Sequence, residues 1–175
     1  MAIYQQILWD LKPRAIIEIG TRFGGSALFF ADIAETFGLD APVFSIDIEN
    51  TRVVDDPRIT FLEGDVHDLH PAFTEARIFD QQRPWFVVED SAHTYSACLA
   101  ALRFFAEVML SGDMLVIEDG ILDELGLSEL CDGGPNRAIA EFFSENSNAF
   151  QVEYDLCDRY GTNATYNPNA YLRKL

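Results

Sequence analysis

Short β-branched apolar runs alternate with longer amphipathic stretches along this chain. A short apolar run that ends at glycine or a polar residue is typical of a buried strand, whereas apolar positions three and four apart are typical of a helix. The pattern predicts strands at residues 15–20, 43–48, 59–62, 85–88 and 114–117. It predicts helices at residues 26–37 and 95–110, and a later one from Pro135 to about Asn146. Ser26 is the expected N-cap of the first helix and Gly38 its expected C′ residue.

The order of these elements predicts an α/β fold. Strands that alternate with helices form parallel βαβ units and a doubly wound sheet. Two last apolar runs, at residues 150–156 and 170–174, have only a loop between them, so we expect them to pair antiparallel. The prediction is a Rossmann-like, mostly parallel sheet of seven strands that ends in an antiparallel hairpin. Because no repeat, low-complexity tract or linker interrupts the sequence, we expect residues 1–175 to form a single domain.

Composition and charge narrow the function. The chain has 12 Lys and Arg residues against 29 Asp and Glu residues, a formal net charge of −17, so no nucleic-acid partner is expected. A hydrophobic content of 49% argues against a disordered acidic tail. No basic segment precedes an apolar run at the start, and no apolar run approaches ~18 residues, so we expect neither a signal peptide nor a membrane partner. Three scattered cysteines suit neither a disulfide framework nor a zinc site, and the expected location is cytoplasmic.

The turn after the first expected strand carries a glycine-rich motif. It reads acid-x-Gly-x-x-x-Gly, with Glu18, Gly20 and Gly24 at the named positions. The lysine of a P-loop is missing, and Arg22 stands where a dinucleotide fingerprint needs glycine, so we expect neither a nucleoside triphosphate nor a pyrophosphate. Glycine permits close approach of the backbone to a ligand, and the Glu18 carboxylate suits a cationic one. The alternative is a turn that serves only strand–helix packing.

This motif resembles motif I of the class I S-adenosylmethionine (SAM) methyltransferases, which implies SAM, a cationic ligand, as the cofactor. Asp47 ends the second expected strand, where doubly wound folds bind a ribose diol. Asp65 and Val66 follow the third strand, where the methyltransferase pattern places contacts to adenine. Taken alone, Asp47 also suits a helix cap and Asp65 a turn. The residues expected to bind SAM are Glu18, Gly20, Thr21, Gly24, Ser26, Asp47, Asp65 and Val66.

Acidic residues also follow the fourth and fifth expected strands. Asp90 follows the fourth, and Glu118 and Asp119 follow the fifth. If these strands are neighbours, their carboxyl ends lie ~5 Å apart, and crowded carboxylates are costly unless a cation or protons neutralise them. All-oxygen ligands suit Mg²⁺, with Ca²⁺ or Mn²⁺ as substitutes. Glu118 and Asp119 can bind one ion only if the strand has ended before Gly120, and the alternative is a helix cap at Asp90 and a solvated loop at the other two.

The Asp90-x-x-His93 and Glu118-Asp119 arrangement resembles that of metal-dependent O-methyltransferases of the catechol and antibiotic-sugar types. The run at residues 158–172 resembles the C-terminal tail of the cephalosporin hydroxylase/rhamnosyl O-methyltransferase family. The resemblance spans roughly residues 13–175. It implies that Asp90, Glu118 and Asp119 bind the metal ion and that His93 is the catalytic base.

The predicted function is therefore metal-dependent transfer of a methyl group from SAM to a hydroxyl of a small molecule, such as a sugar, a phenol or a natural product. One alternative is a non-haem iron oxygenase, whose facial triad would draw on His67, His70, His93 and Asp90. Otherwise we interpret His67 and His70 as surface or loop residues. The other alternative is a SAM-binding module without catalysis.

The acceptor pocket is the least defined part of the prediction. We expect it to draw on residues 49–58 and 120–134, which read as loops. Only a helix-sized stretch precedes the first expected strand, whereas relatives usually carry more. We therefore expect a partner subunit to close the site and predict a homo-oligomer.

Overall fold

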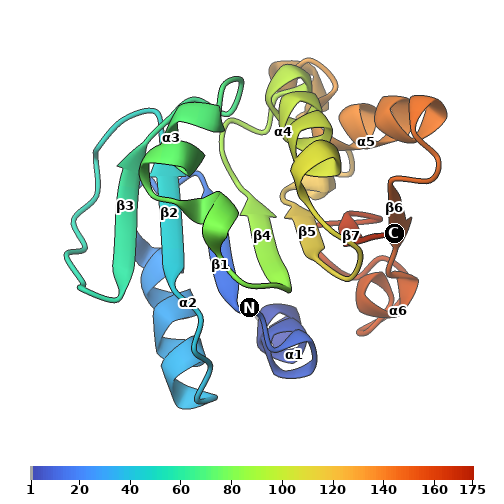
Figure 1. Cartoon of the computed structure of the whole chain (residues 1–175). Helices are drawn as coiled ribbons and strands as arrows, with labels where there is room; N and C mark the ends of the chain where they lie inside the picture. Colours follow the sequence, from blue (N-terminus) through green and yellow to red (C-terminus); the bar gives the residue numbers. More distant parts are fainter. Residues whose placement is uncertain (1) are drawn as a thin grey trace. The chain divides into compact units, whose positions relative to one another are not determined.

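The structure, a computed structural model, describes residues 2–175 and contains one seven-stranded sheet in the order β3-β2-β1-β4-β5-β7-β6 (Figure 1). The strands are β1 (Ala15–Ile19), β2 (Val43–Asp47), β3 (Ile59–Glu63), β4 (Trp85–Glu89), β5 (Met114–Ile117), β6 (Phe150–Val152) and β7 (Tyr171–Lys174). β1 pairs parallel with β2, and β2 with β3, whereas β7 pairs antiparallel with both β5 and β6. The predicted mixed α/β fold is confirmed. The chain forms two compact units, an N-terminal unit up to Val87 and a C-terminal unit from Val88 to Leu175.

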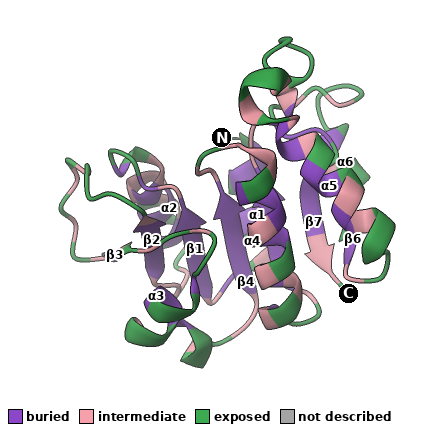
Figure 2. Cartoon of the chain, turned by 90° about the horizontal axis from the view of Figure 1, so that it is seen from above, coloured by how far each residue is buried: buried purple, intermediate pink, exposed green. Residues whose placement is uncertain are grey.

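The N-terminal unit builds its core from apolar strands and aromatic side chains. Its helices are α1 (Ala2–Leu11), α2 (Gly25–Thr36), α3 (His70–Glu75) and the 3-10 helix η1 (Ile78–Asp80). β1 and β2 are buried along almost their whole length (Figure 2), as expected for near-continuous apolar runs in parallel strands. The rings of Tyr4, Phe30 and Phe86 contact one another with centroids 5.7–5.9 Å apart, so they join α1 and α2 to the strand that carries Phe86.

The C-terminal unit is organised around two packed helices. Its helices are α4 (Tyr95–Val108), α5 (Gly134–Glu145), α6 (Tyr154–Cys157) and the 3-10 helices η2 (Gly120–Leu122) and η3 (Ser128–Cys131). α4 begins as a capped helix, because the Thr94 hydroxyl accepts a hydrogen bond from the Ala97 N–H. α4 packs against α5 (Figure 1), with the Arg137 guanidinium 4.0 Å from the Tyr95 ring centroid and the Tyr95 hydroxyl donating to Glu141 at 2.6 Å.

Most expected elements are confirmed with small shifts in their bounds, and two regions differ. The strand expected at residues 150–156 ends at Val152, and α6 follows it. The partner strand β7 begins at Tyr171, and the Tyr171 carbonyl accepts the Glu153 N–H. The residues after Glu153 therefore have no partner strand and form a helical turn. β7 also lies between β5 and β6 in the sheet, an order that the sequence did not predict. None of the helices in residues 2–175 has the length and hydropathy needed to span a membrane.

Candidate active site

The turn after β1 has a backbone that requires glycine. Gly20 and Gly24 have φ angles of +105° and +86°, which residues with a Cβ rarely adopt. A Cβ on Gly24 would also lie 3.0 Å from the Cβ of Val54, closer than side chains normally pack. Gly24 is the N-cap of α2, which begins at Gly25. The expectation that Ser26 is this N-cap is therefore wrong, because the left-handed Gly24, two residues earlier, is the N-cap.

A buried chain of polar side chains lies behind this turn. The Glu18 side chain is 1% exposed, and the Ser45 hydroxyl donates to its Oε2 at 2.5 Å. The hydroxyl oxygens of Thr21 and Ser45 lie 2.6 Å apart. Because the Ser45 proton points to the carboxylate, Thr21 is the donor of this second bond and keeps its lone pairs for a ligand. Sequence reasoning missed Ser45, although a serine inside an otherwise apolar strand was a signal.

A pocket lies at the carboxyl ends of β2 and β3, and we call it the β2–β3 pocket. It is lined by Thr21, Asp47, Glu49, Asn50, Arg52, Phe61, Leu62 and Glu63. Its volume is about 100 Å³, below the roughly 300–1,000 Å³ of sites that hold a whole small-molecule ligand, so it fits one part of a ligand. Asp47 is held by two backbone donors, the Arg22 N–H at 2.7 Å and the Glu49 N–H at 3.3 Å. Each of its carboxylate oxygens retains a lone pair for a ligand hydroxyl.

The predicted SAM residues divide into three groups. Thr21 and Asp47 line the β2–β3 pocket, and Glu18 lies buried behind them. Gly20, Gly24 and Ser26 belong to the turn and to the start of α2. Asp65 and Val66 follow β3 outside the residues that line the pocket, and the Asp65 carboxylate accepts the His67 N–H at 2.9 Å in a local turn. The role of every residue in these three groups as a SAM ligand stays a prediction.

The segment at residues 48–58 supplies Glu49, Asn50 and Arg52 to the β2–β3 pocket. The sequence assigned residues 49–58 to the acceptor pocket as a loop, without naming these side chains. The segment is mostly exposed (Figure 2). It is fastened to the glycine turn, because the Thr51 hydroxyl donates to the Arg22 carbonyl at 3.0 Å and the Val53 N–H to the Phe23 carbonyl at 3.2 Å. The signal for these residues was their place directly after Asp47, at the carboxyl end of a parallel strand.

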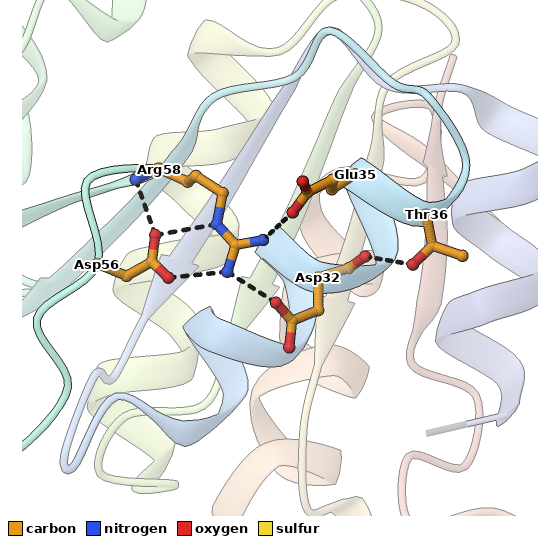
Figure 3. A network of polar contacts seen from close by, with 5 residues as sticks. All are labelled: Asp32, Glu35, Thr36, Asp56 and Arg58. Carbon is orange, nitrogen blue, oxygen red and sulfur yellow. Dashed lines mark hydrogen bonds and ion pairs between the residues drawn. The ribbon is translucent and has the colours of Figure 1, made fainter.

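Arg58 fastens the other end of this segment. Its guanidinium donates to Asp56 of the same segment and to Asp32 and Glu35 of α2 (Figure 3). The distances are 2.9 and 2.7 Å to Asp56 and 2.7 Å to Asp32. These side-chain hydrogen bonds from Arg58 lower the pKa of Asp56 to about 2. The segment is thus anchored to α2 by charge and to the glycine turn by hydrogen bonds to the carbonyls of Arg22 and Phe23.

Three side chains that follow β4 and β5 converge in the C-terminal unit. Asp90, His93 and Asp119 each offer one ligand atom, and these atoms lie within 4.8 Å of one another. His93 Nε2 lies 3.7 Å from Asp90 Oδ1 and 3.4 Å from Asp119 Oδ2. We call this group the Asp–His–Asp cluster. Its side chains are 25–33% exposed, so a ligand can reach them.

The donor atoms of this cluster fit a divalent cation. Carboxylate oxygens suit Mg²⁺, and an imidazole extends the choice to Mn²⁺ and similar ions. Asp90 and Asp119 are two of the three predicted ligands. Glu118, the third, is not in the cluster, and its charge adds to the effect of burial in raising the pKa of Tyr171. The metal role of Glu118 stays a prediction.

His93 has an unusual backbone and a one-sided ring environment. Its φ is +52°, a conformation that is uncommon outside glycine and that concentrates at functional sites. Its Nδ1 is buried without a hydrogen-bond partner, so Nε2 is the atom that faces Asp90 and Asp119. His67 and His70 are exposed and lie outside the cluster, which therefore lacks the second imidazole of an iron facial triad.

A buried carboxylate supports the turn after β4. Glu89 is fully buried and accepts hydrogen bonds from the Ser91 hydroxyl, from the Ser91 N–H at 3.2 Å and from the Cys98 thiol at 3.4 Å. Burial, and then the Glu89 charge, raise the pKa of the Cys98 thiol, which stays protonated and donates. The Glu89 carbonyl accepts the Glu118 N–H at 2.9 Å and so links the end of β4 to the end of β5. Sequence reasoning missed Glu89, although a second acidic residue directly before Asp90 was a signal.

The sheet order, with an antiparallel β7 between β5 and β6, together with the glycine turn and the acid that ends β2, matches the methyltransferase fold of CmcI. The family described as rhamnosyl O-methyltransferase/CmcI matches residues 1–175. The chain belongs to this family of O-methyltransferases, as its C-terminal tail and its acidic motifs predicted.

Known relatives agree with this placement. The rhamnosyl O-methyltransferase of Mycobacterium leprae (strain TN) is 32% identical over 175 residues, covering 97% of this chain and 75% of that protein. Among solved structures, CmcI in a form described as Mg-SAM has a TM-score of 0.75 at 23% identity, covering 99% of this chain and 70% of that one. The apo structure of a TDP-rhamnose 3′-O-methyltransferase of calicheamicin biosynthesis has a TM-score of 0.64 at 18% identity, covering 98% and 75%. At these identities the solved structures show the common fold.

Proposed function

We propose that this chain transfers the methyl group of SAM to a hydroxyl of a sugar-like small molecule and that the reaction depends on Mg²⁺ or another divalent cation. The observation that carries the proposal is the convergence of Asp90, His93 and Asp119 to within 4.8 Å. The acceptor class is supported by relatives named for methyl transfer to rhamnosyl groups and to TDP-rhamnose. The cation is supported by the CmcI structure described as Mg-SAM.

The β2–β3 pocket is the part of the site that we assign to the ribose of SAM. Asp47 offers a lone pair on each carboxylate oxygen, which suits the two hydroxyls of a vicinal diol. Thr21 offers a further acceptor, and Phe61 supplies an apolar wall. Gly20 and Gly24 let the backbone approach the ligand closely. When bound, SAM supplies a methyl group on a positively charged sulfur.

The Asp–His–Asp cluster is the part that we assign to the cation and the acceptor hydroxyl. Asp90 and Asp119 would hold the cation, with Glu118 as the third ligand implied by the family resemblance. When bound, Mg²⁺ supplies a Lewis acid that favours the ionised form of a hydroxyl. His93 would accept the hydroxyl proton at Nε2, because its Nδ1 is enclosed. The acceptor oxygen would then bond to the methyl carbon of SAM as the carbon–sulfur bond breaks, and the bonding electrons would stay on the sulfur.

The experiment is an acceptor screen with labelled SAM and the full chain. TDP-rhamnose and simple rhamnosides are compared with a catechol, each with Mg²⁺, with EDTA, and with Mg²⁺ added back after EDTA. We expect transfer to a rhamnosyl hydroxyl that EDTA abolishes and Mg²⁺ restores. Asp90→Asn should lose this activity, whereas the matched control Asp80→Asn, which removes an exposed carboxylate paired with Arg77, should retain it.

Three results would contradict the proposal. Full activity in excess EDTA would exclude the metal-dependent reaction. SAM binding without turnover on any hydroxylated acceptor would favour a non-catalytic SAM-binding module. Turnover that needs Fe(II) and 2-oxoglutarate but no SAM would favour the oxygenase. The acceptor-binding segments and the homo-oligomer predicted from the sequence stay predictions.

A further inference from the structure

The turn after β5 places Asp119 in a strained backbone conformation. Asp119 has φ +61° and ψ +27°, in the left-handed region that residues other than glycine seldom adopt. Aspartate and asparagine tolerate this region better than most residues, but they hold it only where the surroundings supply hydrogen bonds. This conformation directs the carboxylate of Asp119 to 3.4 Å from His93 Nε2. Whatever holds the turn therefore also holds the Asp–His–Asp cluster.

The C-terminal tail supplies the groups that hold this turn. The Asp119 N–H donates to the side-chain Oδ1 of Asn167 at 3.0 Å, and the Ile121 N–H donates to the Tyr166 carbonyl at 2.9 Å. A Cβ on Gly120 would lie 3.1 Å from the Cδ of Pro168, so the tail lies directly against the turn. The family resemblance singled out this tail, and the proposed function does not use it.

Asn167 is itself held in one orientation. It is 3% exposed, its backbone N–H donates to the Thr165 hydroxyl at 3.2 Å, and its Nδ2 lies 3.5 Å from the Tyr171 hydroxyl. The hydroxyls of Thr165 and Tyr171 are 2.8 Å apart and so belong to the same network. Because Nδ2 can only donate, it belongs on the Tyr171 side, and Oδ1 is then aimed at the Asp119 N–H.

We propose that Asn167 is a positioning residue for the cation site. Its Oδ1 holds Asp119 in the left-handed conformation, and this keeps the Asp119 carboxylate in the Asp–His–Asp cluster and sets the cation affinity. The inference rests on the proposed function, because it assigns the cluster to a cation. Partners that orient metal ligands typically change metal affinity by about 10- to 100-fold when they are replaced. A residue that served only the packing of the tail would leave the affinity unchanged in any variant that still folds.

The test measures the affinity of the SAM-free full chain for Mn²⁺ alone, by calorimetry and by the electron paramagnetic resonance spectrum of the bound ion. Asn167→Leu keeps a similar shape but removes the acceptor, and Asn167→Asp keeps an oxygen for the Asp119 N–H. Asn146→Leu is the matched control, because the Asn146 side-chain amide also bonds a backbone group in this unit, donating to the Phe142 carbonyl at 3.3 Å. We expect N167L to weaken Mn²⁺ binding about 10- to 100-fold and to alter the spectrum, with N167D and N146L within about threefold of the wild type.

A second measurement does not depend on how the variants fold. In the wild-type chain, amide hydrogen exchange of Asp119 should be as slow as that of Ile121, because both amides bond the tail. Exchange of the Asp119 amide at the rate of exposed loop amides would overturn the inference.

The variant results separate the inference from the proposed function. If the wild type binds Mn²⁺ and a folded N167L binds it equally well, the inference alone is overturned. The same follows if N167D loses as much affinity as N167L, or if N146L does, since the acceptor oxygen is then not the cause. If the wild type binds no Mn²⁺, the cation site fails, and the inference fails with it.

Discussion

The imidazole Nε2 of His93 and the carboxylate Oδ2 of Asp119 lie 3.4 Å apart, and both residues have left-handed backbones although they follow different strands. Each such conformation costs about 1–3 kcal/mol outside glycine. The cost is offset by local contacts, which at Asp119 are hydrogen bonds from the C-terminal tail. Strain at two residues whose side chains meet is typical of a functional site and agrees with the cation site that we propose.

The first prediction concerns His93 as the base. His93→Asn removes the imidazole but tolerates the left-handed backbone, so the turn should persist. Loss of a general base should lower kcat by about 10²–10⁴-fold, with SAM and cation affinities close to those of the wild type. Steady-state kinetics and calorimetry test this, and a variant that keeps more than about a tenth of kcat contradicts the base role. A fall in cation affinity would make His93 a ligand instead.

The second prediction concerns Asp47 as the ribose contact. Asp47→Ala should weaken SAM binding by about 1.5–3 kcal/mol, because hydrogen bonds to a charged group are lost. Calorimetric titration with SAM measures this directly. Asp40→Ala is the control, since Asp40 is an exposed carboxylate paired with Arg14. Unchanged SAM affinity in the Asp47 variant would move the ribose contact to Glu49.

The third prediction compares two neighbouring glycines. Gly24→Ala places a Cβ at φ +86° and 3.0 Å from the Cβ of Val54, so it should lower the free energy of unfolding by about 1–3 kcal/mol. Gly25→Ala is the matched control, because nothing lies within 4 Å of its added Cβ and it begins a helix. That variant should be neutral or up to about 1 kcal/mol more stable. Urea denaturation tests both, and equal effects would contradict the backbone argument.

The fourth prediction concerns acid stability. Arg58 lowers the pKa of Asp56 to about 2, whereas an unfolded aspartate titrates near about 3.9. The ionised pair therefore stabilises the folded chain fully above about pH 4, and this stabilisation is lost as the pH falls toward about 2. In Asp56→Asn, the free energy of unfolding should fall less steeply over this range. Denaturant titrations at several pH values measure the slopes, and identical slopes would show that the Asp56–Arg58 pair adds nothing.

The candidate site was predictable as far as it follows strand ends. Asp47, Asp90 and Asp119 were predicted because parallel strands bring their carboxyl ends to one edge of a sheet, and each lies in the pocket or the cluster described above. Ser45 was not assigned to the site, and Glu49 was assigned only as part of the loop at residues 49–58, because their roles depend on which residues their side chains meet. The same holds for Asn167, which contacts Asp119 across a separation of 48 residues.

The sequence by itself determined the α/β class, the strands β1 to β5 and the glycine turn, because apolar periodicity and the need for a positive φ are local properties of the chain. Only the tertiary structure decided that β7 lies between β5 and β6, that the run after Val152 turns into a helix, and that Glu118 stands outside the Asp–His–Asp cluster. These outcomes depend on which distant backbone groups are available as hydrogen-bond partners. Periodicity carries no information about those partners, because it records the face on which a residue lies but not the element that faces it.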